Sequence, residues 1–264
     1  MHFDFWFNIV FLKLRPLLYS LVFLVGLELI VLYHRHVPIL LFFLLIISII
    51  QGKSVGRKWK FSVLPAFFTL TSAALLYLIT IHYEQQIFIF LASFLYYLSL
   101  FGAYRLNMYA QDQTAKGMNM AATVSTIFFA FASAYGLYLN FFVPLWSLML
   151  AYLIVTLLVS YQHYSIIYPE TPGLKENRSP RKIVWVYSFI LALSMAEIIW
   201  ALNFWPFGYL TTGAVALILY YVLWELIQSH FLNLLSKRRV MANVIFFSAL
   251  IFMILLSSKW LPIK

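Results

Sequence analysis

The feature that most constrains the fold is a series of nine long apolar stretches separated by polar connections. Most of them are about 18–23 residues long, the length of a helix that crosses roughly 30 Å of hydrocarbon. A transmembrane barrel would instead show segments of about ten residues with alternating polarity. The pattern predicts an all-α, polytopic transmembrane helical bundle of about nine spans. The predicted spans are 16–33, 37–51, 61–82, 86–104, 118–139, 141–162, 183–202, 207–229 and 240–258.

The composition agrees with a membrane setting. Hydrophobic residues make up 64% of the 264 residues and charged residues only 10%, whereas soluble domains carry about 25% charged residues. A chain of this kind has too few polar side chains to cover its surface in water. It also has no cysteine, which excludes disulfides and thiolate metal sites.

The basic residues follow the loops between the predicted spans. In a soluble protein, a net charge of +10 would suggest binding to nucleic acid. Here the basic residues instead indicate which loops lie on the cytoplasmic side, and we expect no nucleic-acid partner. If all nine segments cross, fifteen of the 18 Lys and Arg residues fall on one side and three on the other. That excess predicts a cytoplasmic N-terminus and an outer C-terminus. It also favours a full crossing by segment 37–51. This segment has only 14 apolar residues, which is short for a span, so the alternative is a re-entrant segment.

The connections predict how the chain is divided. Those on the outer side are very short, so the spans are expected to pair in tight hairpins that turn there. The only sizeable polar segment, 165–182, holds prolines and charges of both signs. It predicts a cytoplasmic linker between a six-helix part, 1–164, and a three-helix part, 183–264. The N-terminal stretch before Pro16 lacks a small-residue cleavage site and is predicted to be an interfacial lead-in rather than a removed signal peptide.

Three acids fall within the predicted spans: Glu28, Glu197 and Glu225. An ionised carboxylate in hydrocarbon costs several kcal/mol, so such side chains usually face the bundle interior or a water cavity. Glu225 lies near the inner interface, where it can snorkel or pair with a basic residue. Glu28 and Glu197 lie deeper, and we expect both to point into a polar pocket. The structural alternative is a hydrogen bond to a neighbouring helix.

The stretch around Glu197 holds the predicted site for a substrate or an ion. Trp200 lies one helical turn further out, and Thr211 and Thr212 begin the returning helix after a tight turn. Local unwinding there would give the kind of broken helix with which transporters coordinate ions. The alternative is that these two threonines cap the start of an ordinary helix. The predicted binding residues are Glu197, Glu28, Thr211, Thr212 and Trp200.

Other residue patterns predict packing rather than chemistry. Ladders of small residues let helix backbones approach closely, and they occur at Ala122, Thr126, Ala130 and Ala134, and at Gly208, Thr212 and Ala216. Histidines at the predicted outer ends of spans do not supply three or four converging ligands, so no metal site and no cofactor are predicted. No catalytic residue is predicted either, because H-E-x-x-H, G-x-S-x-G and paired-aspartate motifs are absent.

Glu197, Trp200, Trp205 and Pro206 form the arrangement E-x-x-W-x-x-x-x-W-P. In this arrangement the last third of the chain resembles an uncharacterised family of bacterial multi-pass membrane proteins. The resemblance implies a multi-pass protein of the plasma membrane, which in bacteria is the inner membrane. It implies no particular activity.

Three functions fit these observations. The favoured one is a small transporter or flippase-like protein with a polar cavity around Glu197. The second is a membrane enzyme that acts on a lipid-linked substrate with Glu197 as acid or base, which requires another polar group within hydrogen-bond reach. The third is a non-catalytic membrane subunit with acids buried between helices and an exposed small-residue face. Expected partners are membrane lipids, a hydrophobic or lipid-like ligand, and further copies of the chain or a partner subunit.

Overall fold

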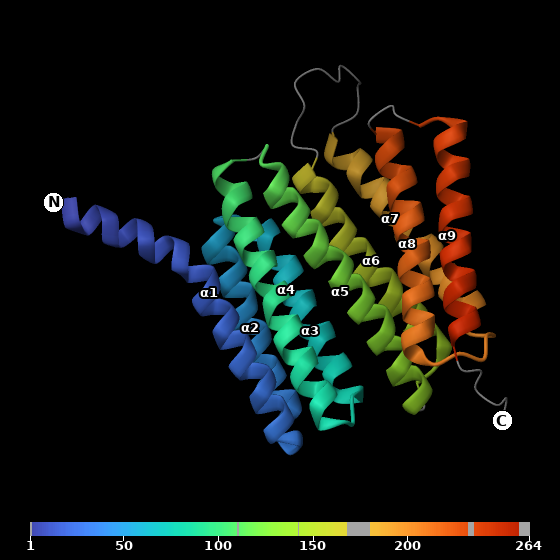
Figure 1. Cartoon of the computed structure of the whole chain (residues 1–264), viewed down its shortest axis with the longest axis horizontal. Helices are drawn as coiled ribbons and strands as arrows, with labels where there is room; N and C mark the ends of the chain where they lie inside the picture. The colour runs from blue at the N-terminus through green and yellow to red at the C-terminus, as the bar shows by residue number, and fades with distance from the viewer. Residues whose placement is uncertain (1, 110, 142, 168–179, 232–234, 259–264) are drawn as a thin grey trace. The chain divides into compact units, whose positions relative to one another are not determined.

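The computed structural model describes residues 2–109, 111–141, 143–167, 180–231 and 235–258 (Figure 1). Within these residues the chain is all-α, as predicted, and every predicted span is confirmed as a helix. In the described part of the chain, nine segments are long and apolar enough to cross a membrane, which is consistent with a multi-pass membrane protein. The orientation of the termini stays a prediction. The helices are α1 (His2–Leu32), η1 (His34–His36), α2 (Val37–Gly56), η2 (Trp59–Ser62), α3 (Val63–Leu78), α4 (His82–Met108), α5 (Gln113–Asn140), α6 (Leu145–Ile167), α7 (Pro180–Leu202), α8 (Tyr209–Phe231) and α9 (Lys237–Ser257).

The short second span is longer as a helix than as an apolar run. The apolar run ends near residue 51, but α2 continues to Gly56 and reaches 20 residues. Gly52 and Gly56 allow this extension to pack on η2, because a β-carbon at either position would collide with Phe61. The helix α2 is therefore long enough to cross, which supports the charge-based prediction over the re-entrant alternative.

The predicted lead-in and the first span form one helix, α1, with Pro16 inside it. Pro16 has no backbone N–H, so one hydrogen bond of the helical ladder is missing there. The side chains of residues 1–13 lie outside the described part of the structure. The interfacial position of the lead-in therefore stays a prediction.

Two compact units divide the chain: unit 1, Met1–Thr126, and unit 2, Ile127–Lys264, with the boundary inside α5. The predicted division into 1–164 and 183–264 stays a prediction, and residues 168–179 of its linker lie outside the described residues. Contacts nevertheless join the two sides of that linker, because α6 packs extensively on α7 within unit 2.

In unit 1 each of the helices α1 to α4 contacts the other three. Their shared core holds the stacked rings of Phe23 and Tyr96, whose centroids lie 4.2 Å apart. The Tyr96 hydroxyl donates a hydrogen bond to Gln51 Oε1 at 2.7 Å, and Ser48 and Thr69 share another at 2.6 Å. These bonds join α2 to α4 and α2 to α3, so the core is held by polar contacts as well as by apolar packing.

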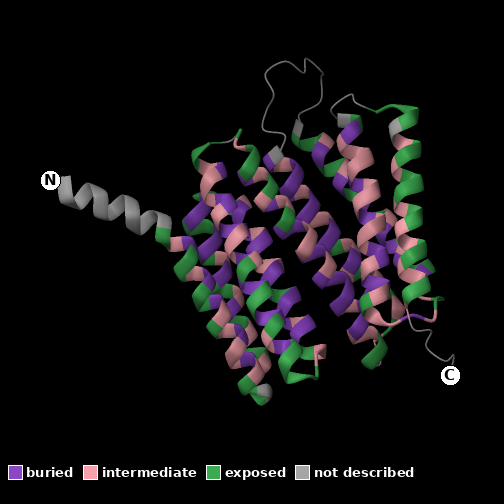
Figure 2. Ribbon diagram, in the orientation of Figure 1, coloured by how far each residue is buried: buried purple, intermediate pink, exposed green. Residues whose placement is uncertain are grey.

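In unit 2 the helix α7 packs on α6 and α8, and α9 packs on α8. Gly213 of α8 meets α5 so closely that a β-carbon there would lie 2.9 Å from Ala132 Cα. The close contact of α8 thus lies at Gly213, which is not part of the predicted ladder, and Gly208 of that ladder precedes the helix and has open space beside it. No residue of Val240–Ser257 is buried, so α9 is peripheral in the described unit (Figure 2).

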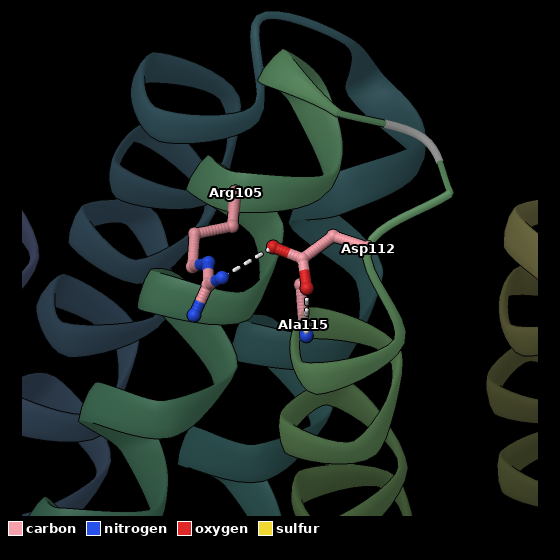
Figure 3. Close-up of polar contacts among 3 residues, drawn as sticks. All are labelled: Arg105, Asp112 and Ala115. Atoms are coloured by element: carbon pink, nitrogen blue, oxygen red, sulfur yellow. Dashed lines mark hydrogen bonds and ion pairs between the residues drawn. The ribbon is translucent and has the colours of Figure 1, made fainter.

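An ion pair and a helix cap fix the turn from α4 to α5. The guanidinium of Arg105 lies 2.7 Å from the carboxylate of Asp112 (Figure 3). The same carboxylate accepts a hydrogen bond from the backbone N–H of Ala115 at 3.2 Å, which satisfies one of the donors left open at the start of α5. One acidic side chain therefore holds the end of α4 through an ion pair and caps the start of α5.

Candidate functional site

Glu197, the centre of the predicted site, lies on the exposed face of α7. Its neighbours on that face are Leu193 and Trp200, which are 44% and 50% exposed. No hydrogen bond or ion pair joins Glu197 to the described residues. The prediction that Glu197 points into a pocket of the bundle is therefore wrong. The reason is that α7 packs through its other side, where Met195 and Ile199 are fully buried.

Glu28 differs, because it has a partner inside unit 1. Its carboxylate accepts a hydrogen bond from Gln86 Nε2 at 3.2 Å, which joins α1 to the start of α4. Glu28 itself is half-buried. This contact matches the structural alternative, a hydrogen bond to a neighbouring helix, rather than the predicted pocket shared with Glu197.

The remaining predicted residues are spread over unit 2. Trp200 is exposed, Thr211 is half-buried and Thr212 is buried. Thr212 faces the hydroxyl of Tyr135 on α5. Neither threonine is bonded to Glu197, so within unit 2 the predicted set does not converge on one point.

The histidines at the predicted outer ends of spans do not form a cluster either. His36, His82 and the nearby Glu84 are exposed, and the side chain of His34 lies outside the described residues. Among the side chains that the structure describes, no group of three or more His, Asp or Glu is placed to hold a metal ion.

A cavity of about 230 Å³ opens instead in unit 1, at the end where α1 begins its span and α2 and α4 finish. This is the end that the loop charges place on the cytoplasmic side. The helices run antiparallel, so residues far apart in the sequence meet there. The lining residues are Arg15, Pro16, Ser54, Val55, Arg57, Tyr104, Asn107 and Met108.

The lining of this cavity is cationic. Two arginines, Arg15 and Arg57, line it together with the polar residues Ser54, Tyr104 and Asn107. None of the lining residues that the structure describes is acidic. Guanidinium groups present planar pairs of N–H donors that match phosphate and carboxylate oxygens. The chemistry of the cavity is therefore that of an anion site.

The backbone at Arg57 adds a local argument. Arg57 ends α2 in the left-handed conformation, with φ of 55°. That conformation costs a residue with a β-carbon about 1 kcal/mol, and glycine almost nothing. An arginine where glycine would be easier favours a role for its side chain.

The family of the chain has no known function. A family model with the description "Protein of unknown function (DUF5656)" matches residues 21–257. The chain belongs to this family. No curated protein and no solved structure matches this chain.

Membership of the DUF5656 family extends the predicted resemblance. The sequence arrangement around Glu197 covered only the last third of the chain, whereas the family match also includes α2, α4 and the cavity residues Ser54, Arg57 and Tyr104. The prediction that the chain belongs to an uncharacterised family is confirmed. Its bacterial origin and a location in the plasma membrane stay predictions.

Sequence reasoning missed the cavity because it treated Arg15 and Arg57 only as topology markers. The available signal was their position, since both fall at the same predicted end of consecutive spans. Antiparallel neighbours bring such residues together. Charge counting assigns a side of the membrane to a residue, but it does not tell whether the residue faces lipid, water or a neighbouring helix.

Proposed function

We propose that this protein is a transporter or flippase-like membrane protein that handles an anionic, lipid-like ligand. Its headgroup site is the cavity between Arg15 and Arg57. The single observation that carries the proposal is that two arginines line one cavity together with serine, tyrosine and asparagine, with no acid among the described lining residues. Phosphate is the ligand group that this donor set matches best.

The size of the cavity favours a headgroup over a whole lipid. Its volume of about 230 Å³ is below the range of roughly 300–1,000 Å³ in which drug-sized ligands are buried. Acyl chains would stay outside, along the exposed leucines of α1 that continue from Arg15. Leu14, Leu17 and Leu18 are each more than two-fifths exposed. The ligand would thus place its charge in the protein and its chains in the bilayer.

The charge distribution supports a location on the inner leaflet. With the N-terminus cytoplasmic, as the division of fifteen to three basic residues predicts, the cavity opens at the cytoplasmic side. Anionic phospholipids are abundant in that leaflet and attract basic groups near its surface. The location in a plasma membrane is part of the proposal.

The two other candidate functions have less support. An enzyme with Glu197 as acid or base needs a second polar group beside it, and Glu197 has no such partner among the described residues. A non-catalytic subunit fits the contact of Glu28 with Gln86. It does not fit the small residues Thr212, Gly213 and Ala216, which are buried within unit 2 rather than exposed for a partner.

Binding of fluorescent phosphatidic acid to the purified full chain tests the headgroup site, with phosphatidylcholine as competitor. In Arg15→Gln/Arg57→Gln we expect the Kd to rise about tenfold or more, because one charged hydrogen bond lost is worth about 1.5–3 kcal/mol. Arg57→Gly should weaken binding while it stabilises the fold, since glycine removes the backbone cost. The matched control is Lys58→Gln, an exposed neighbour that does not line the cavity.

Transbilayer movement is tested in proteoliposomes with the same variants. Dithionite bleaches fluorescent lipid in the outer leaflet, so a flippase-like protein increases the fraction that is bleached. Wild type and Lys58→Gln should do so, and Arg15→Gln/Arg57→Gln should not. Equal binding by wild type and the double variant would overturn the site. Normal binding without transbilayer movement would keep the site and overturn the transporter class.

A further inference from the structure

A line of buried polar side chains runs along one face of α6 in unit 2. Tyr152, Thr156, Ser160 and His163 follow one another at intervals of four, four and three residues and are each at most 1% exposed. At about 100° per residue these positions fall within roughly 80° of the helix circumference. The face turns toward α5 and α8 and not toward lipid.

Contacts from α5 and α8 extend this line. The Tyr152 hydroxyl donates to the Phe131 carbonyl of α5 at 2.9 Å, and Ser160 shares a hydrogen bond of 3.0 Å with the Tyr220 hydroxyl of α8. The His163 ring lies edge-on to Trp224 of α8, with 5.2 Å between centroids. Buried polar groups from three helices therefore meet along one interface.

Tyr135 and Thr212 continue the line beyond Tyr152. Tyr135 lies one helical turn from Phe131 on α5 and faces Thr212 near the start of α8. Along the axis, Tyr152 to His163 is about 16 Å, and Phe131 to Tyr135 adds about 6 Å. The line thus covers about 22 Å of a hydrocarbon layer that is roughly 30 Å thick.

Several polar atoms of the line make no hydrogen bond within the described part of the chain. They are the hydroxyl of Thr156 and both ring nitrogens of His163. Other buried threonines, such as Thr69 and Thr126, bond to the carbonyl one turn back. Successive groups on one helix face lie about 5–6 Å apart between β-carbons, a gap that a single water molecule bridges.

We propose that this line is a proton-conducting path through unit 2, with bridging waters between its hydroxyls and His163 at its inner end. Each hydroxyl oxygen accepts a proton from one side and releases its own to the other. At His163 one ring nitrogen accepts a proton while the other releases its proton, so the neutral imidazole is restored without net charge. Protons therefore move, and no oxidant or reductant is needed. The path lies in unit 2 and is independent of the anion cavity of unit 1.

Proton flux into liposomes tests the path. The full chain is reconstituted with a pH-sensitive dye inside, and valinomycin with a potassium gradient sets the membrane potential. We expect wild type to acidify the lumen faster than protein-free liposomes. Thr156→Val keeps the shape of the side chain and removes the hydroxyl, so the flux should fall to the protein-free rate. Thr156→Ser keeps a hydroxyl and should restore the flux.

The matched control is Thr126→Val, since Thr126 is as fully buried as Thr156 but its hydroxyl is bonded to Ala122. It should conduct like wild type. His163→Phe, which keeps an aromatic ring beside Trp224, is the second variant and should also lose the flux. Monodisperse gel filtration of each variant excludes misfolding. Wild-type flux no faster than that of empty liposomes, or unchanged flux in both Thr156→Val and His163→Phe, would overturn the path and leave the line as helix-packing hydrogen bonds only.

Discussion

Glu28 in α1 and Glu197 in α7 are alike in the sequence and different in the structure. Each is a lone acid in an apolar span, about nine residues before a proline near the start of the next helix. Glu28 is half-buried and bonded to Gln86, whereas Glu197 is exposed among apolar side chains. The depth of a residue along a span can be read from sequence, but the side of the helix on which it lies cannot.

The difference has an energetic consequence. Glu28 exchanges water for a hydrogen bond within the protein, which limits the cost of burying it. At its predicted depth, Glu197 has apolar neighbours such as Leu193 and no donor from the described chain. A carboxylate in hydrocarbon costs several kcal/mol, so a charged Glu197 in the bilayer needs a donor from outside the described chain. Three sets of variants test this comparison.

The largest effect is expected from Ala196→Leu, next to Glu197 on the buried side of α7. Ala196 is 4% exposed, so the larger side chain overpacks the contacts of α7 and should cost about 1–3 kcal/mol in unfolding free energy. Ala201→Leu makes the same change at an exposed position of the same helix and should stay within about 0.5 kcal/mol. Denaturation in detergent measures both. Equal effects would mean that the assigned buried face of α7 is wrong.

The faces of α7 explain how far sequence reasoning reaches. Nine spans were predictable because length and hydrophobicity alone determine which segments can cross a membrane. The packing face was not, since buried Ala192 and Met195 and exposed Ile190 and Leu193 are all apolar. In water the polar side of a helix marks its surface, but in lipid both sides are hydrophobic.

The candidate site was unpredictable for a related reason. Glu197 is the unusual residue of its predicted span, because an acid in the membrane interior is rare. The arginines of the cavity lie at helix ends, where basic residues are common and topology already accounts for them. Only the packing of α1, α2 and α4 brings Arg15 and Arg57 to one cavity. Helix pairing of this kind is a long-range property that span lengths and loop charges do not encode.

An intermediate effect is expected from breaking the Glu28 contact. Gln86→Ala removes the donor to the carboxylate of half-buried Glu28 and should lower the unfolding free energy by about 0.5–1.5 kcal/mol. In a double-mutant cycle with Glu28→Ala, the two changes should cost less together than their sum, because they remove the same bond. Glu84→Ala, an exposed acid of the same helix end, should be additive with Gln86→Ala. Additivity of Glu28→Ala with Gln86→Ala would show that the contact contributes nothing.

The smallest effect is expected at Glu197 itself. Glu197→Leu and Glu197→Gln should each change the unfolding free energy in detergent by less than about 0.5 kcal/mol, since neither removes a contact within the described chain. Glu28→Leu is the contrasting variant, because it leaves Gln86 without its acceptor. A melting temperature for Glu197→Leu several degrees below wild type would mean that the carboxylate has an internal partner after all. If stability is unchanged but Glu197→Gln abolishes lipid movement in proteoliposomes, the carboxylate acts from the lipid-facing side of α7. The acid would then be functional, as the sequence predicts, with its ligand reaching it from the bilayer rather than from a cavity inside the bundle.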